Sequence, residues 1–160
     1  MAIRDEVTAA NDQYAVDFAK GDLPMPPGRH FAVVTCMDAR LDPAKFLGLD
    51  EGDAHVIRNA GGIVTDDALR SLVISHHLLG TQEALVIGHT DCGMLTFTDS
   101  ELRERLGPDA EGTAFHSFPH LEERVRESVD AIRDSTLLPA SFGATGYVYD
   151  VRSGRLQAVT

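Results

Sequence analysis

The stretch VVTCMDAR, residues 33–40, places a thiol, a carboxylate and a guanidinium at two-residue spacing, on Cys36, Asp38 and Arg40. Side chains two positions apart in a strand point to the same face, so these three would line one face of a strand. Ligands bind at the carboxyl ends of strands in open α/β sheets. An Asp38–Arg40 pair alone would indicate a salt bridge, in which the arginine keeps the carboxylate ionised. The cysteine beside the pair favours a site that performs chemistry.

The segment IGHTDCGM supplies two further metal-binding side chains, His89 and Cys92, separated by two residues. That spacing suits two ligands that approach one ion from a turn. Together with Cys36 they form a Cys₂His set of zinc ligands, and Asp38 is a nearby carboxylate. A structural zinc site normally has four dedicated ligands, whereas three protein ligands leave a fourth position open, as in catalytic zinc sites. The sequence therefore predicts a catalytic metal centre between the ends of two strands.

The segments that carry these residues are predicted to be strands of one sheet. FAVVTC is a short apolar run rich in β-branched residues, as expected for a buried strand. AHVIRNAGG, which ends in glycines, and EALVIGH are predicted to be the second and third strands. Helical patterns alternate with them, which predicts an α/β fold: a mostly parallel β-sheet flanked by helices on both faces. The last segment, GYVYDVRSGRLQAVT, has the pattern of a C-terminal β-hairpin or edge strand that turns at Ser153–Gly154. The predicted helices lie within residues 3–20, 41–53, 66–79, 91–107 and 118–135.

The chain of 160 residues is expected to form a single domain, residues 1–160. Residues 1–20 are predicted to be an N-terminal helix arm, because the Pro/Gly-rich connector GDLPMPPGRH cannot continue a helix. No apolar run approaches the roughly 20 residues that a membrane helix needs. The formal net charge of −11 argues against nucleic acid and anionic membranes as partners, because both attract Lys and Arg.

The two cysteines, Cys36 and Cys92, also bear on the compartment. The N-terminus carries charges throughout and lacks the apolar block of a secretory signal, so we expect a cytoplasmic protein. In that compartment, cysteines indicate metal binding or catalysis more often than a disulfide.

Three motifs, in order, resemble the signature of the β-class carbonic anhydrases. CMDAR matches CxDxR, IRNAGG at residues 57–62 resembles the RNAG segment, and HTDC matches HxxC. The resemblance covers nearly the whole chain, and the short length and runs such as VTDDALRSL and HTDCGMLTFTD look like those of the compact bacterial members. It implies a mostly parallel sheet and one Zn²⁺ per chain, bound by Cys36, His89 and Cys92.

The resemblance also implies a reaction. Members of the family hydrate carbon dioxide reversibly to bicarbonate and a proton, with hydroxide generated at the zinc as the nucleophile. Asp38 either is a fourth zinc ligand in a closed resting state or pairs with Arg40 and accepts a hydrogen bond from the attacking hydroxide. The active site of the family lies at a dimer interface, which implies a homodimer or a higher even oligomer.

Two alternatives to carbon dioxide hydration stay open. Relatives with the same zinc ligands hydrolyse carbonyl sulfide or carbon disulfide, which are linear molecules like carbon dioxide. A protein of another class would use Cys36 and Cys92 as a redox switch, or hold the zinc in a closed structural site. A cysteine phosphatase is excluded, because its loop needs an arginine six residues after the cysteine and residue 42 is aspartate.

The substrate pocket is the least determined part of the site. Plant-type members carry a glutamine shortly before the CxDxR strand that hydrogen-bonds the substrate, and PMPPGRH contains none. Asn59, Gly61 and Gly62 are pocket candidates, because glycines allow close backbone approach and the following helix N-terminus favours anions. A tight turn with positive φ is the alternative reason for these glycines. No proton shuttle is assigned, and we expect surface or packing roles for His55, His76, His77, His116 and His120.

Overall fold

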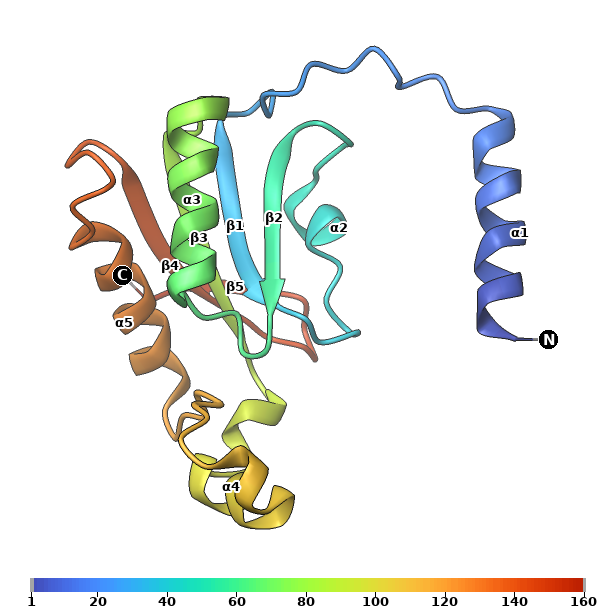
Figure 1. Ribbon diagram of the computed structural model, residues 1–160. Helices are drawn as coiled ribbons and strands as arrows, with labels where there is room; N and C mark the ends of the chain where they lie inside the picture. The colour runs from blue at the N-terminus through green and yellow to red at the C-terminus, as the bar shows by residue number, and fades with distance from the viewer. Residues whose placement is uncertain (1, 160) are drawn as a thin grey trace.

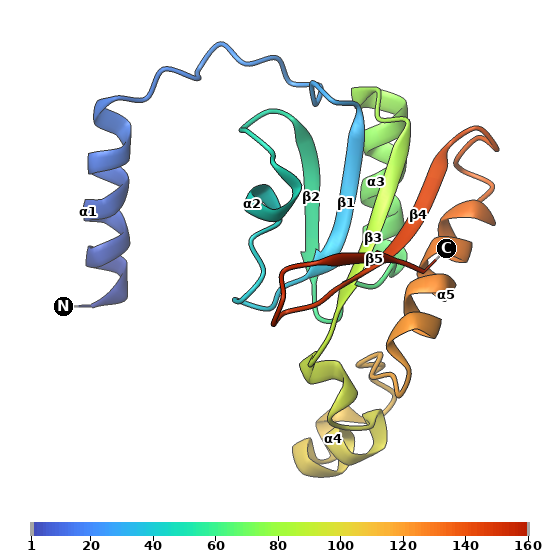
Figure 2. The same ribbon diagram turned by 180° about the vertical axis from the view of Figure 1, so that it is seen from behind.

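Five strands form a single sheet in the order β2–β1–β3–β4–β5 in the computed structural model, which describes residues 2–159 (Figures 1 and 2). The strands β1, β2, β3 and β4 run parallel, and β5 pairs antiparallel with β4. This confirms the predicted α/β fold with an antiparallel C-terminal strand pair. The strands are β1 Phe31–Cys36, β2 Ala54–Asn59, β3 Glu83–His89, β4 Gly143–Tyr149 and β5 Leu156–Ala158.

The register of the parallel strands brings the site segments to one edge of the sheet. All six residues of β1 are buried, as expected for an apolar strand in a parallel sheet with both faces covered. Its last residue, Cys36, lies opposite Asn59 of β2. Thr35 lies opposite Ile87 of β3, shortly before His89. The carboxyl ends of β1, β2 and β3 therefore meet where the predicted metal ligands lie.

Helices flank both faces of the sheet, as predicted, but unequally. The helix α3 Asp66–Leu79 packs on β1 and β2, and α5 Leu121–Arg133 packs on β3 and β4 (Figure 1). The short helix α2 Pro43–Leu47 covers the other face, where Phe46 stacks on Tyr149 with ring centroids 4.4 Å apart. Beyond the carboxyl ends of the strands lie α4 Asp99–Leu106 and the 3₁₀ turns η1 Gly93–Leu95 and η2 Pro108–Ala110.

Helix α3 begins and ends where its sequence predicts. The Thr65 hydroxyl accepts a hydrogen bond from the backbone N–H of Ala68, and Gly80 ends the helix in the left-handed conformation with φ +76°. The helix predicted over 118–135 starts only at Leu121. The backbone N–H of Phe118 is bonded to Met94 instead, and the proline that follows disfavours helical backbone at Phe118.

The C-terminal turn is wider than the predicted two-residue turn at Ser153–Gly154. The carboxylate of Asp150 accepts the backbone N–H groups of Arg152 and Ser153. The backbone N–H of Asp150 reaches the carbonyl of Arg155, so the loop between β4 and β5 extends over residues 150–155. An aspartate that bonds to the backbone beyond it is a common way to close such a loop.

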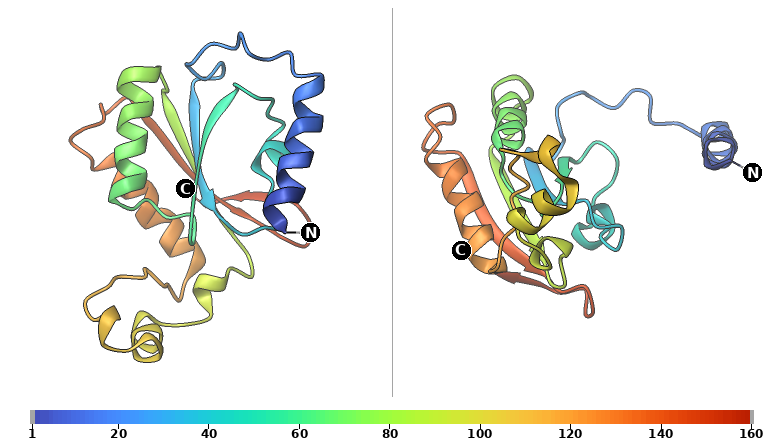
Figure 3. Two further views of the ribbon diagram at one scale, coloured as in Figure 1. Left: turned by 45° about the vertical axis from the view of Figure 1, so that its right-hand side comes forward. Right: turned by 60° about the horizontal axis from the view of Figure 1, so that its bottom comes forward.

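Helix α1 Ile3–Val16 stands apart from the sheet, and a long connector leads from it to β1 (Figures 1 and 3). It ends before residue 20, and Lys20 forms an ion pair with Glu51 outside the helix. None of the residues of α1 is buried. In the part of the chain that the structure describes, no helix is long and apolar enough to cross a bilayer.

Candidate metal centre

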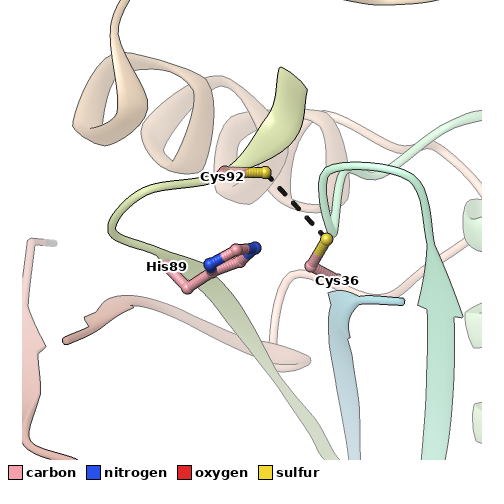
Figure 4. Close-up of side chains that lie close together, drawn as sticks. All are labelled: Cys36, His89 and Cys92. Atoms are coloured by element: carbon pink, nitrogen blue, oxygen red, sulfur yellow. Dashed lines mark hydrogen bonds between the residues drawn. The ribbon is translucent and has the colours of Figure 1, made fainter. Parts of the chain in front are cut away.

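Three buried side chains converge at the carboxyl edge of the sheet, as predicted: Cys36, His89 and Cys92 (Figure 4). Cys36 ends β1, His89 ends β3, and Cys92 is the residue before η1. One potential ligand atom from each residue lies within 4.8 Å of the other two. Among the described residues 2–159, no other group of three or more Cys, His, Asp or Glu side chains has the spacing of a metal site.

The two sulfur atoms have the separation that one metal ion would require. Cys36 Sγ and Cys92 Sγ lie 4.0 Å apart, and both cysteines are free. Two sulfurs each about 2.3 Å from a tetrahedral zinc would be roughly 3.8 Å apart. The pKa of Cys36 is lowered by a hydrogen bond from Cys92, although burial opposes this effect. The pKa of Cys92 is raised by the same bond and by burial, so the pair retains a proton that a cation would displace.

The imidazole of His89 is oriented toward the same point. Its Nδ1 lies 2.9 Å from the backbone carbonyl oxygen of Thr90, a bond in which Nδ1–H donates. Its Nε2 is buried and has no hydrogen-bond partner in the described structure. A buried polar atom without a partner is costly, and a metal ion would accept this lone pair. The donor set, the sulfur separation and the orphaned nitrogen all fit a Zn²⁺ ion.

Asp38 and Arg40 form the predicted pair, but they lie in the turn after β1 and not on one face of a strand with Cys36, because β1 ends at Cys36. Arg40 donates from Nε to Asp38 Oδ1 at 3.0 Å and from Nη2 to Oδ2 at 2.7 Å. The backbone N–H of Arg40 also donates to Oδ1, at 2.9 Å. These bonds hold the pKa of the Asp38 carboxyl well below its usual range. Asp38 Oδ2 lies 3.8 Å from His89 Nε2, so the ionised carboxylate stands beside the ligand cluster while it is paired with Arg40.

Two residues that support the site were not singled out from the sequence. Arg58 donates from Nε to the carbonyl of Cys36 at 2.9 Å and from Nη2 to the carbonyl of Asp38 at 2.8 Å, which fixes the turn after β1. Thr90 donates its backbone N–H to Tyr149, and its hydroxyl accepts the N–H of Val151. Arg58 lies in the RNAG-like segment, which is the signal that could have identified it.

The glycine segment after β2 shapes the site mainly as a turn. The Asn59 side chain closes it, accepting the N–H of Ile63 at 3.0 Å and donating to the Ile63 carbonyl at 2.8 Å. Gly61 and Gly62 have φ values of +91° and +63°, which favour glycine. A Cβ on Gly62 would lie 2.6 Å from the backbone nitrogen of Cys36, so only glycine lets the turn pack on the end of β1.

A small cavity of about 160 Å³ opens at the ligand cluster. Gly61 lines it, whereas Asn59 and Gly62 do not, so those two pocket candidates act through the turn that they form. The walls contributed by Ala60 and Met94 are apolar. The full lining is Cys36, Met37, Asp38, Ala60, Gly61, Cys92, Gly93 and Met94.

The five histidines expected to have packing or surface roles all lie outside this cavity. His55 bonds to the Ser75 hydroxyl, His76 to the Thr81 carbonyl and His77 to the Leu137 carbonyl. These bonds tie α3 to neighbouring segments.

The fold and the site together define an α/β protein with a candidate metal centre of two cysteines and one histidine. A family model described as carbonic anhydrase matches residues 31–135. Beta-carbonic anhydrase 1 of Mycobacterium tuberculosis (strain ATCC 25618 / H37Rv) is 48% identical over 164 aligned positions, covering 100% of this chain and 99% of that protein. The chain therefore belongs to the β-class carbonic anhydrase family.

Two further proteins are similar to this chain. The crystal structure of carbonic anhydrase from Streptococcus mutans has a TM-score of 0.95 and 45% sequence identity, covering 100% of this chain and 99% of that chain. Carbon disulfide hydrolase from Acidianus sp. (strain A1-3) is 34% identical over 173 aligned positions, covering 91% of this chain and 83% of that protein.

Proposed function

We propose that the protein catalyses the zinc-dependent, reversible hydration of carbon dioxide to bicarbonate and a proton. The observation that carries the proposal is the buried Cys36–His89–Cys92 cluster with an ionised, arginine-held Asp38 beside it, in a chain of the β-class family. The three clustered side chains would hold one Zn²⁺ per chain. When bound, the ion supplies Lewis acidity, which makes hydroxide available near neutral pH.

Asp38 orients the nucleophile in this proposal. An ionised carboxylate has acceptors only, so it can receive a hydrogen bond from a water or hydroxide O–H but not from an anion without a proton. Arg40 donates to both of its oxygens and keeps the carboxylate aimed toward the cluster rather than within it. The apolar wall of Ala60 and Met94 accepts a small neutral molecule next to this polar edge.

Hydrolysis of a carbon dioxide analogue, carbonyl sulfide or carbon disulfide, on the same site is the second candidate, favoured by the 34% identical carbon disulfide hydrolase. We expect stopped-flow measurements to show carbon dioxide hydration with kcat/KM at least about a hundredfold above that for carbon disulfide, because the carbonic anhydrase relative is 48% identical and the carbon disulfide hydrolase only 34%. Sulfide release under the same conditions measures the second reaction. Chelated protein is the control, and sulfide release faster than hydration would make the second candidate the function.

We infer that the protein is a cytoplasmic homodimer or higher even oligomer, built from one domain with an N-terminal arm. Helix α1 supports the oligomer, because its apolar residues Ile3, Val7, Ala10 and Tyr14 recur at helical spacing and are exposed to solvent. Isolated helices shorter than roughly 12–15 residues are marginal in water. With 14 residues and no buried side chain, α1 would gain its stability by packing on a second copy.

Deleting residues 1–20 is therefore expected to convert the oligomer to a monomer, as measured by analytical ultracentrifugation. Val7→Asp should weaken association in the same way, since it places a charge in the apolar stripe of α1. Thr8→Asp adds the same charge on the other side of the helix and is the matched control. An oligomer that survives both the deletion and Val7→Asp would refute the role of the arm.

A further inference from the structure

The guanidinium of Arg40 is held from two sides, and the second side belongs to the segment that carries two of the metal ligands. Arg40 donates from Nη1 to Asp91 Oδ2 at 2.7 Å and from Nη2 to the backbone carbonyl of Asp91 at 2.9 Å. Its Nε and Nη2 groups donate to the two oxygens of Asp38. We propose that Asp91 is a positioning residue, which keeps Arg40 paired with Asp38 and thereby keeps Asp38 out of the ligand cluster.

The two bonds to Asp38 fix the guanidinium relative to that carboxylate, but they leave the Asp38–Arg40 pair free to move as one unit. Here the donors on both edges of one planar guanidinium are engaged, so its plane and its rotamer are fixed. The Asp91 side chain is 70% exposed. An exposed ion pair contributes little to folding stability, so the effect of this contact is on orientation.

The position of Asp91 in the chain makes the contact a link between two loops. Asp91 lies between His89 and Cys92, and its φ of +56° places it in the left-handed region, which aspartate and asparagine tolerate better than most residues. In that conformation, both the carboxylate and the backbone carbonyl of Asp91 accept hydrogen bonds from Arg40. Arg40 therefore ties the turn after β1 to the turn after β3, which are the two turns around the candidate metal centre.

The contact between Asp91 and Arg40 matters because Asp38 lies close enough to the ligand cluster to bind a metal ion there instead of pairing with Arg40. Its Oδ2 is 3.8 Å from His89 Nε2, the nitrogen that faces the cluster, and it is a carboxylate that a metal ion would also bind. An Asp38–Arg40 pair that is free to move would release Asp38 toward the cluster for part of the time. The clamp by Asp91 favours the arrangement in which Asp38 accepts hydrogen bonds from Arg40 and the fourth metal position stays open.

The test compares Asp91→Gly with Asp91→Asn, and it rests on the proposed function only for its kinetic readout. Glycine removes the carboxylate and accommodates the positive φ, so backbone strain does not confuse the result. Asparagine keeps an oxygen that can accept from Nη1 of Arg40 and tolerates the same backbone. Asp67→Ala is the control, because it removes an aspartate from an exposed pair with Arg70 on α3 that does not line the cavity.

With zinc, we expect Asp91→Gly to lose about tenfold in kcat/KM at unchanged metal content, since small misplacements of a positioned group are costly. Asp91→Asn should keep most of the wild-type kcat/KM, and Asp67→Ala should match the wild type.

The Co²⁺-substituted protein gives a readout that does not depend on turnover. The visible spectrum of Asp91→Gly should shift, and thiocyanate should bind more weakly, because Asp38 would compete for the open position. An unchanged spectrum and an unchanged thiocyanate affinity in Asp91→Gly would overturn the proposal. Absence of hydration by the wild type would instead count against the proposed function and leave the cobalt test of the clamp intact.

Discussion

The Cys92→Ser variant is expected to be purified with almost no zinc and to lose nearly all carbon dioxide hydration. A serine hydroxyl does not ionise at neutral pH and is a poor zinc ligand, so the set of two thiolates and one imidazole is reduced to two good ligands. We expect metal affinity to fall by at least about a hundredfold, because ligands contribute most of the binding free energy of such sites. Elemental analysis of the purified protein gives the zinc content per chain, and stopped-flow hydration gives the activity.

Chelator-treated wild type is the control for the Cys92→Ser variant. Zinc added back should restore activity to the wild type but not to the variant. Thermal unfolding should show that the metal-free variant still folds cooperatively, with a modestly lower Tm than metal-free wild type, because serine places a smaller polar hydroxyl where a thiol is buried. A variant that keeps a full equivalent of zinc would show that Cys92 is not a ligand and that the candidate metal centre is wrongly composed.

Arg40→Ala is expected to separate metal binding from turnover. The ligand set is intact in this variant, so zinc should stay near one equivalent per chain. Turnover should fall roughly a hundredfold, the cost typical of losing a group that orients charge in a site. Without Arg40 the pKa of Asp38 rises toward its ordinary value of about 3.9, so the carboxylate stays ionised at neutral pH. The loss would therefore come from misplacement of Asp38 and not from its protonation.

Arg40→Lys is the matched control for the Arg40→Ala experiment. Lysine keeps the charge but cannot donate to both carboxylate oxygens in the fixed geometry of a guanidinium, so an intermediate loss is expected. Zinc content and kcat are measured on the same preparations. Equal losses of zinc and of turnover in Arg40→Ala would contradict the division of roles between the ligand cluster and the Asp38–Arg40 pair.

The sheet and its ligand cluster could be predicted because their determinants are local. FAVVTC and EALVIGH are strands by composition, and parallel strands bring their carboxyl ends to one edge, so Cys36 and His89 were expected at the same edge of the sheet. The caps of α3 were equally local, since Thr65 and Gly80 act within one turn of the helix.

The remaining features depend on contacts between distant segments. The role of Arg58 in the turn after β1 and the contact between Asp91 and Arg40 join residues that are far apart in sequence. The start of α5 at Leu121 depends on a backbone bond between Phe118 and Met94. The two adjacent glycines also differ in role, which the sequence does not reveal. Gly61 lines the cavity, whereas Gly62 packs on Cys36.

The orientation of His89 has a consequence for how the protein folds. Its Nδ1 is bonded to the Thr90 carbonyl, and Thr90 is itself held by Tyr149 and Val151, in and just after β4. A segment far from His89 in the sequence thus completes the pocket that β1 and β3 begin. A folding intermediate in which β4 has not yet paired with β3 would consequently present its thiols without a fixed imidazole.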